Sequence, residues 1–115
     1  EDGRIRINYK VKFITDSFNP IFGIVIRSEN GINTFVTNTR MKGIKSDKYT
    51  SGEEKVVSIE FNNYLDTGKY SVSPAVAYSD GIRFYDWRDN WFWFSVKKAY
   101  KTGGILNFDH SIEIK

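Results

Sequence analysis

The sequence contains no cysteine and only one histidine, His110, among its 115 residues. The absence of cysteine excludes disulfides, thiolate nucleophiles and cysteine-ligated zinc. His110 lies near the end of the sequence, where we interpret it as a solvent-exposed residue and not as a catalytic base. No serine has a histidine placed plausibly to activate it. We therefore predict no catalytic residue, no metal site and no cofactor.

Long apolar runs and phosphate-binding motifs are also missing. No apolar stretch is long enough to span a bilayer, and the first residues show no signal-peptide pattern. No glycine-rich loop followed by Lys and then Ser or Thr is present, which excludes the usual phosphate-cradling nucleotide site. Because the sequence begins with Glu1 and not with methionine, we expect residues 1–115 to be one domain of a longer chain.

Charge of one sign is only slightly in excess, with 17 Lys and Arg against 14 Asp and Glu and a formal net charge of +3. This bias is too small to argue for a nucleic-acid partner, and we predict none. The segment 4–14 alternates polar and apolar residues. We interpret its cationic row as the solvated face of an edge strand, with contact to phosphate or an acidic glycan as the alternative. The row consists of Arg4, Arg6, Lys10 and Lys12.

Sustained helical periodicity is absent, and the residue pattern instead predicts an all-β protein. Strict alternation over 4–14 and a near-continuous apolar run over 21–27 each predict a strand. Further strands are predicted over 32–37, 54–65, 70–79 and 107–115, with turn-forming residues between them. About eight short antiparallel strands at regular spacing indicate a β-sandwich.

Three further features of these strands carry specific expectations. Leu65, Gly68 and Tyr70 have the spacing of a tyrosine corner, in which the phenol bonds to backbone near a turn and pins a crossover between sheets. Pro74 lacks a backbone donor, which favours an edge strand or a bulge at this point. In the last strand, Ile112 and Ile114 are expected to point inward.

Residues 82–96 contain all three tryptophans of the sequence. The polar triplet Arg88-Asp89-Asn90 separates two β-prone runs, which predicts a hairpin with a three-residue loop and with Trp87 opposite Trp91. Side chains alternate between the two faces of such a hairpin. One face then carries Tyr85, Trp87, Trp91 and Trp93, and the other carries Ile82, Phe84, Asp86, Phe92, Phe94 and Val96.

Both faces of this hairpin are apolar, so we expect one to be core and the other to cover a ligand or a partner. The face with Phe84 and Phe94 is the expected core. Sugars present flat C–H surfaces that stack on aromatic rings, and their hydroxyls need fixed polar groups nearby. The alternative is a tryptophan pair packed under a neighbouring sheet, with the remaining rings sealing a dimer contact. The candidate ligand-binding residues are Arg83, Tyr85, Trp87, Arg88, Asp89, Asn90, Trp91 and Trp93.

Asp86 and Asp89 flank the tryptophans, which raises glycoside hydrolysis by a carboxylate pair as an alternative. Such a pair usually comes from separate strands of a deep cleft. Two aspartates beside one turn more often bond the turn backbone or a ligand hydroxyl. We therefore predict that the domain binds a ligand and is not an enzyme.

Five segments, in their order and spacing, resemble one known family. They are Asn19-Pro20-Ile21-Phe22-Gly23-Ile24-Val25-Ile26-Arg27, Asn30-Gly31, Phe35-Val36-Thr37-Asn38-Thr39, Leu65-x-x-Gly68-x-Tyr70 and Phe94-x-Val96. The family is the C-terminal carbohydrate-binding domain of ATP-binding subunits of polysaccharide ABC exporters, the Wzt type that handles O-antigen and related glycans. The resemblance covers about residues 4–96, and the cluster 85–93 is richer in tryptophan than the family's usual pattern.

The resemblance implies an immunoglobulin-like β-sandwich that recognises a lipid-linked polysaccharide without catalysis. It also implies a homodimer in a transporter complex at the cytoplasmic face of the cell membrane, with the ATPase domain upstream in the parent chain. The sugar would stack on the aromatic face, and the neighbouring Arg, Asp and Asn side chains would bond its hydroxyls or an acidic substituent. The alternative is a structural immunoglobulin-like interaction module of a surface protein, in which this face contacts another domain.

Overall fold

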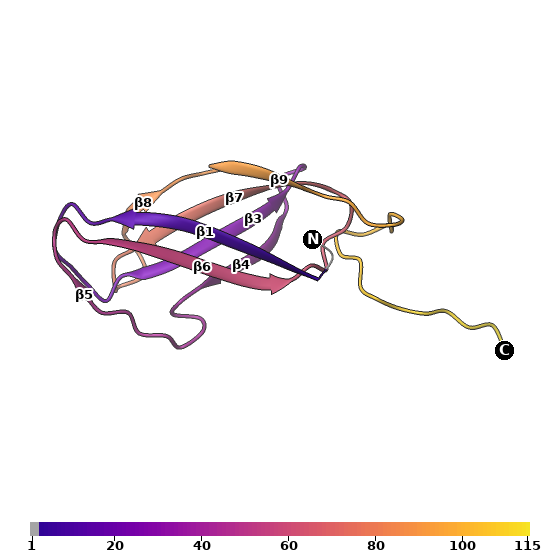
Figure 1. Ribbon diagram of the computed structural model, residues 1–115, viewed down its shortest axis with the longest axis horizontal. Coiled ribbons are helices and arrows are strands. Elements are labelled where there is room, and N and C mark those ends of the chain that lie inside the picture. Colours follow the sequence, from indigo (N-terminus) through magenta and orange to yellow (C-terminus); the bar gives the residue numbers. More distant parts are fainter. Residues whose placement is uncertain (1–2) are drawn as a thin grey trace.

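The computed structural model describes residues 3–115, which form nine strands and no helix (Figure 1). The strands are β1 (Arg4–Lys12), β2 (Ser17–Phe18), β3 (Ile21–Ser28), β4 (Asn33–Asn38), β5 (Lys48–Tyr49), β6 (Glu54–Asn62), β7 (Gly68–Ala77), β8 (Phe84–Trp87) and β9 (Phe92–Val96). The described residues accordingly include no helix that could cross a membrane. The predicted all-β class is confirmed.

The strands form two main antiparallel sheets that pack face to face. One sheet consists of β1 and β6. The other has the order β4-β3-β7, and both β8 and β9 pair with the remaining edge of β7. A short ladder between β2 and β5 is separate from both. This arrangement is the predicted immunoglobulin-like β-sandwich.

The hydrophobic core lies between the two sheets, because alternate residues of each strand point inward. Ile7 of β1 packs with Ile24 and Ile26 of β3 and with Val72 of β7, all of them buried, and the inward side chains of β9 pack against this cluster. A second cluster at the far end of β1 contains Phe13, Phe22 and Val76, with Tyr49 and Tyr85 against it. The two clusters together span the length of the sandwich.

The cationic row of β1 faces away from the core and is balanced by β6. Arg4 Nε lies 3.0 Å from Glu60 Oε2, and Arg6 Nη2 lies 3.4 Å from Glu60 Oε1. These hydrogen bonds, first from Arg4 and then from Arg6, lower the pKa of the Glu60 carboxyl. Exposed ion pairs of this kind contribute little to stability. The row is therefore the solvated face of an edge strand, as predicted.

The tyrosine corner is confirmed. The Tyr70 hydroxyl donates to the backbone oxygen of Asp66 at 2.7 Å, and Tyr70 itself is buried. Burial raises the pKa of the Tyr70 phenol, so it stays a hydrogen-bond donor. The bond fixes the entry of the chain into β7, the strand with which both β8 and β9 of the aromatic segment pair.

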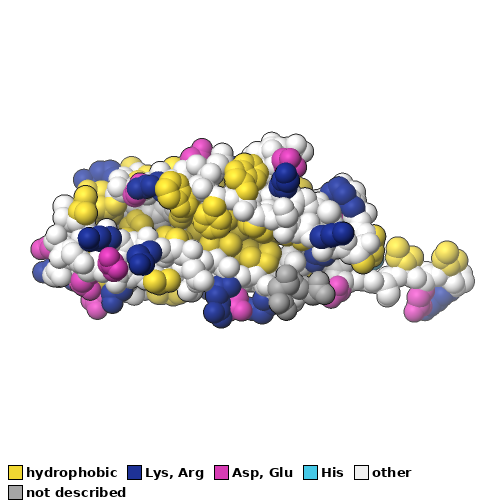
Figure 2. All heavy atoms as spheres, turned by 45° about the horizontal axis from the view of Figure 1, so that its top comes forward, with side chains coloured by type: hydrophobic (Ala, Val, Ile, Leu, Met, Phe, Trp, Pro, Cys, Tyr) yellow, Lys and Arg dark blue, Asp and Glu magenta, His cyan; other side chains and the backbone are white. Residues whose placement is uncertain are grey.

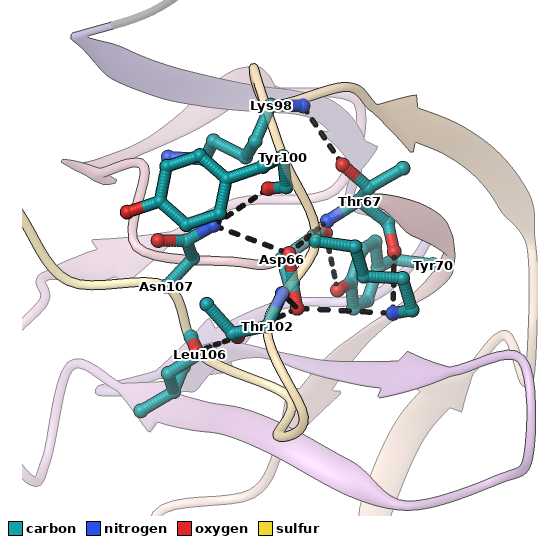
Figure 3. A network of polar contacts seen from close by, with 9 residues as sticks. Asp66, Thr67, Tyr70, Lys98, Tyr100, Thr102, Leu106 and Asn107 are labelled. Carbon is teal, nitrogen blue, oxygen red and sulfur yellow. Dashed lines mark hydrogen bonds and ion pairs between the residues drawn. The ribbon is translucent and has the colours of Figure 1, made fainter.

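The buried Asp66 carboxylate ties the segment 98–107 to this corner (Figure 3). It accepts hydrogen bonds from Thr102 N and Oγ1 at 2.9 and 2.8 Å, from Thr67 N at 2.8 Å and from Asn107 Nδ2 at 3.3 Å. Burial opposes the charge of Asp66, but these bonds outweigh it, so its pKa is lowered to about 2. We call Asp66, Thr67, Thr102 and Asn107 the Asp66 clamp.

Beyond the clamp, the predicted last strand over 107–115 is wrong. None of these residues forms a strand, and after Phe108, whose ring centre lies 5.2 Å from that of Tyr64, the chain extends away from the sandwich (Figure 1). Ile112 and Ile114, expected to point inward, are 82% and 99% exposed. A strand needs a neighbouring edge to pair with, and the clamp directs this tail away from the edges of its own chain.

Candidate functional site

The aromatic segment 82–96 is not a hairpin. β8 and β9 each pair antiparallel with β7, with Trp87 opposite Ala75 and Trp93 opposite Ser71. The two strands therefore run in the same direction and form one edge strand that is interrupted at residues 88–91. The predicted pairing of Trp87 with Trp91 is wrong because the long edge of β7 pairs with both halves of the segment.

The interruption lies beside Pro74 of β7. Arg88 N donates to Pro74 O at 3.0 Å, and Trp91 N donates to Val72 O at 2.8 Å. In an antiparallel ladder the N–H and C=O of one residue point to the same neighbouring strand. Pro74 therefore lacks a donor on the side of β8 and β9. The expected irregularity at Pro74 is found in the partner strand, whereas β7 itself is central and not an edge.

The interruption is a bulge with two additional residues. The seven residues from Trp87 to Trp93 face only five residues from Ala75 to Ser71. Asn90 takes a φ of +48°, a region that asparagine adopts more readily than most residues. Bulges bend a strand and redirect its side chains. Here the bulge folds Asp89 and Asn90 over the face of the larger sheet that is turned away from β1 and β6.

The two side chains are held there by β3 and β7. Arg27 Nη1 donates to Asp89 Oδ1 at 2.6 Å and to Ser73 Oγ at 3.1 Å. Asn90 N donates to the buried Ser73 Oγ at 2.8 Å, while Ser71 Oγ donates to Asn90 Oδ1 at 2.7 Å. The bulge is thus bonded through both its backbone and its side chains.

Two tryptophans lie on the same outward face. Trp87 and Trp93 are exposed and pair with the outward residues Ala75 and Ser71, whereas Phe92 and Phe94 turn toward the core. We call this group the outer cluster. It consists of Arg27, Ser73, Trp87, Asp89, Asn90 and Trp93.

The charges of the outer cluster form one pair. The hydrogen bond from Arg27 is the main cause that lowers the pKa of the Asp89 carboxyl, which is therefore ionised at neutral pH. The Asp89 side chain is 59% exposed, whereas that of Arg27 is only 21% exposed. The cluster thus presents a fixed carboxylate acceptor to solvent, with its counter-charge held behind it.

A second candidate site lies between the sheets. The outer edges of β1 and of β8 and β9 have no strand partner among the described residues, and between them lies a groove of about 940 Å³. Figure 2 shows a hydrophobic patch in the middle of this side of the molecule. We call the groove between these edges the apolar groove. Its walls include Tyr9, Val11, Phe13, Val76, Tyr85, Trp91 and Phe92.

Polar groups of the apolar groove are largely engaged with the protein. The Tyr9 hydroxyl donates to Gly23 O at 2.9 Å, and burial raises the pKa of this phenol. At the rim, Arg88 Nε bonds both oxygens of Asp86, and its guanidinium lies 4.8 Å from the Trp91 ring centre. Aromatic and aliphatic side chains form most of the groove lining, which also includes Asn8, Lys10, Lys12, Thr15, Ser17, Asp86 and Arg88.

The structure separates the eight residues that the sequence grouped as one ligand site. Trp87, Asp89, Asn90 and Trp93 lie in the outer cluster, and Tyr85, Arg88 and Trp91 line the apolar groove. Arg83 belongs to neither site, because its Nε donates to Asp80 at 2.9 Å and its guanidinium lies over the Tyr78 ring. The prediction that the four aromatic residues share one face is wrong.

The predicted core face is correct for β9 and wrong for β8. Phe92, Phe94 and Val96 pack against the core as expected, but Ile82, Phe84 and Asp86 are exposed. A register shift beside Val76 and Ala77 explains the difference, since it turns Tyr85 inward and Phe84 outward. Tyr85 stacks on Tyr78 at 3.8 Å, and Phe84 contacts Trp87 at 5.2 Å.

Sequence reasoning missed Arg27, Ser71 and Ser73. Arg27 ends the predicted apolar run over 21–27, and nothing in that run indicates that its side chain takes part in a site. Small residues occupy every second position of β7, and this alternation could have indicated that one face of the strand carries no large side chains. They are Ser71, Ser73, Ala75 and Ala77. Within residues 3–115 no group of three or more metal-ligating side chains comes together.

Comparisons with known proteins agree with the architecture. The model of the Wzt C-terminal domain family matches residues 2–108. Among solved structures, the crystal structure of the C-terminal domain of wzt superposes with a TM-score of 0.86 at 18% identity, covering 99% of this chain and 71% of that chain. At this identity the likeness shows the fold alone. The search of curated proteins gave no match.

Proposed function

The chain belongs to the Wzt C-terminal domain family, and from this premise we propose that it is a non-catalytic carbohydrate-binding domain. It recognises a lipid-linked cell-surface polysaccharide for export by an ABC transporter, at the inner face of the cell membrane. The outer cluster is the proposed binding site. The observation that carries the proposal is the pair of exposed indoles, Trp87 and Trp93, on either side of the fixed Arg27–Asp89 pair.

The chemistry of the outer cluster suits a sugar. Indole faces take up the C–H surface of a pyranose ring, and the Asp89 carboxylate accepts hydrogen bonds from its hydroxyls. Asn90 uses its side-chain oxygen for Ser71, so its amide nitrogen is the group that would donate to a ligand. Because these groups are already bonded to buried serines, little ordering is needed on binding.

The apolar groove suits a sugar less well. Hydroxyl groups buried without partners are costly, and the groove walls are mainly aromatic and aliphatic. Its two long sides are unpaired strand edges, which favour another polypeptide strand. We assign the groove to protein contact for this reason.

We further propose a homodimer. The tail 108–115 carries exposed isoleucines at alternate positions, Ile112 and Ile114, which is the pattern of a strand without its sheet. The unpaired edges beside the apolar groove would accept such a strand from a second copy. The assembly then joins the exporter through the parent chain.

Two aspects of the outer cluster support a role without catalysis. A general acid needs a carboxyl whose pKa is raised, whereas the pKa of Asp89 is lowered by its hydrogen bond from Arg27. Asp86 bonds Arg88 through both of its oxygens at the groove rim. Neither carboxyl is placed as the proton donor of a glycosidase.

A glycan array probed with the 115-residue chain tests the proposed function. We expect retention of a cell-surface polysaccharide, loss of retention by Trp87→Ala and Trp93→Ala, and normal retention by Trp91→Ala, which alters an exposed tryptophan of the groove. A chain that retains no glycan would support the structural interaction module instead. Loss of retention only in Trp91→Ala would move the site to the apolar groove.

A further inference from the structure

We propose that the outer cluster binds a run of three or four consecutive neutral sugar units aligned with β7, so that no single sugar fills the site. This inference rests on the proposed glycan-binding function and adds the length, direction and charge of the bound segment. It is carried by the register of the edge strand against β7.

The separation of the two indoles sets the length. Trp87 and Trp93 lie opposite Ala75 and Ser71, four residues apart on β7. At a rise of about 3.4 Å per residue, the two positions are roughly 14 Å apart. A pyranose unit advances a glycan by about 5 Å, a distance set by a few bonds of about 1.5 Å each. One ring on each indole therefore leaves room for one or two rings between them.

The middle of this span is polar. Ser73 lies midway between Ser71 and Ala75 on β7, and it holds Asn90 and, through Arg27, Asp89 at the same level. The order along the strand is therefore indole, polar group, indole. A central sugar would bond through its hydroxyls while its two neighbours stack.

β7 contributes no large side chain to this span. Between the two tryptophans its outward face carries only Ser71, Ser73 and Ala75, and the bulge lies over Ser71 and Ser73. Asp89 and Asn90 of the bulge are bonded to these serines, so they form the surface between the indoles. A glycan that contacts both indoles would pass over these two polar groups.

The charge of the pair indicates a neutral glycan. Asp89 is the exposed member, while Arg27 is mostly buried and already bonds Asp89, Ser73 and Asn33. An acidic sugar at the central position would meet the Asp89 carboxylate before the guanidinium. Like charges at such distances disfavour binding.

The test uses a ladder, monomer to hexamer, cut by partial hydrolysis from the polysaccharide that the array retains. Affinity is measured by titration calorimetry, with tryptophan fluorescence as a second readout. We expect affinity to rise from monomer to trimer or tetramer and then to level off. Trp87→Ala and Trp93→Ala should each weaken trimer binding about tenfold and flatten the rise between dimer and trimer.

Trp91→Ala is the matched control and should bind the whole ladder as the unmodified chain does. If either alanine variant melts at a lower temperature, Trp87→Met and Trp93→Met keep apolar volume there without an indole. A monomer that binds as tightly as the trimer, or an effect of only one of Trp87 and Trp93 at every length, would overturn this inference while leaving glycan binding intact. Preference for an acidic polysaccharide would overturn its charge assignment. An array that retains nothing removes the proposed function, and this inference with it.

Discussion

The outer cluster and the apolar groove share one edge strand but satisfy their polar groups in different ways. In the outer cluster, buried serines and Arg27 hold an exposed carboxylate and an exposed amide in place. In the groove, the Tyr9 hydroxyl is already bonded to backbone, and most of the lining side chains are aromatic or aliphatic. Tryptophan occurs in both. Aromatic content is therefore common to both sites, and the fixed polar groups between the rings are what distinguishes the outer cluster, the reason we propose it and not the groove as the glycan site.

The largest expected effect is the difference in stability between substitutions on the two faces of β9. Phe94 stacks on the buried Tyr70 with ring centres 5.7 Å apart, so Phe94→Ala should lower the free energy of unfolding by roughly 3 kcal/mol. Trp93→Ala, one residue away on the outward face, should change it by less than about 1 kcal/mol. Denaturant unfolding of the two variants measures both. Equal losses would mean that the assignment of the faces is wrong.

A smaller effect is expected at the base of the outer cluster. Ser73→Ala removes the acceptor of the Asn90 N–H and should lower the free energy of unfolding by roughly 1–2 kcal/mol. It should also weaken binding of the array-selected glycan, because the bulge is no longer fixed. Ser79→Ala, at an exposed position after β7, is the control and should change neither quantity. A stable Ser73→Ala variant with unchanged glycan affinity would show that the bulge keeps its conformation without the hydrogen bond to Ser73.

Glycan affinity should be lost only at low pH. Asp89 must be ionised to accept from a sugar, and Arg27 lowers its pKa from the ordinary value of 3.8, so affinity should persist below the pH at which a free aspartate is protonated. Arg27→Met should move the loss of affinity to higher pH. Arg83→Met, which breaks a pair outside both sites, should not.

Circular dichroism at each pH is needed beside that titration. The pKa of Asp66 is lowered from 3.8 to about 2, so its contribution to stability is complete above about 3.8 and is lost as the pH falls toward 2. Loss of glycan binding while the β-sheet signal persists reports Asp89. Identical pH profiles for the unmodified chain and Arg27→Met would contradict the role of the Arg27–Asp89 pair.

The smallest effect on glycan affinity is expected from changes at the tail. Removal of residues 109–115 should leave outer-cluster binding unchanged, because the tail lies on the far side of the Asp66 clamp. Sedimentation should change from dimer to monomer, and the exposed groove should bind a hydrophobic dye more strongly. A full-length variant with Ile112→Ser and Ile114→Ser should behave in the same way. A truncated chain that remains a dimer would show that another surface joins the copies.

The parts of this molecule that could be predicted from sequence are those encoded locally. Period-two alternation in β1 and the spacing of Leu65, Gly68 and Tyr70 each depend on neighbours within one segment, and the structure confirms both. The hairpin failed because a strand's partner is chosen over long range, and β7 competed with the local turn for both halves of the segment.

The candidate site was predictable only in part for the same reason. Trp87, Asp89, Asn90 and Trp93 could be named from their own segment, but Arg27 lies 62 positions before Asp89. Tyr85 was placed on the wrong face because the register shifts beside Val76 and Ala77, and Trp91 because it lies in the bulge, where strict alternation does not hold. The tail was predicted as a strand from its apolar alternation, but alternation does not tell whether a sheet edge is available, and Ile112 and Ile114 are exposed.

Pro74 has one further consequence, which concerns how the sheet avoids misalignment as it forms. If residues 88–91 were drawn into a regular ladder, every later residue of the edge strand would slide by two positions along β7. A shift by one residue would turn the apolar side chains to the solvent face, so their burial disfavours it. A shift by two residues keeps the same side chains inward, so their burial does not disfavour it. A continuous ladder would need a donor from Pro74, which proline does not have. A single proline in a central strand therefore disfavours a change of register by two residues, which the burial of apolar side chains alone would permit.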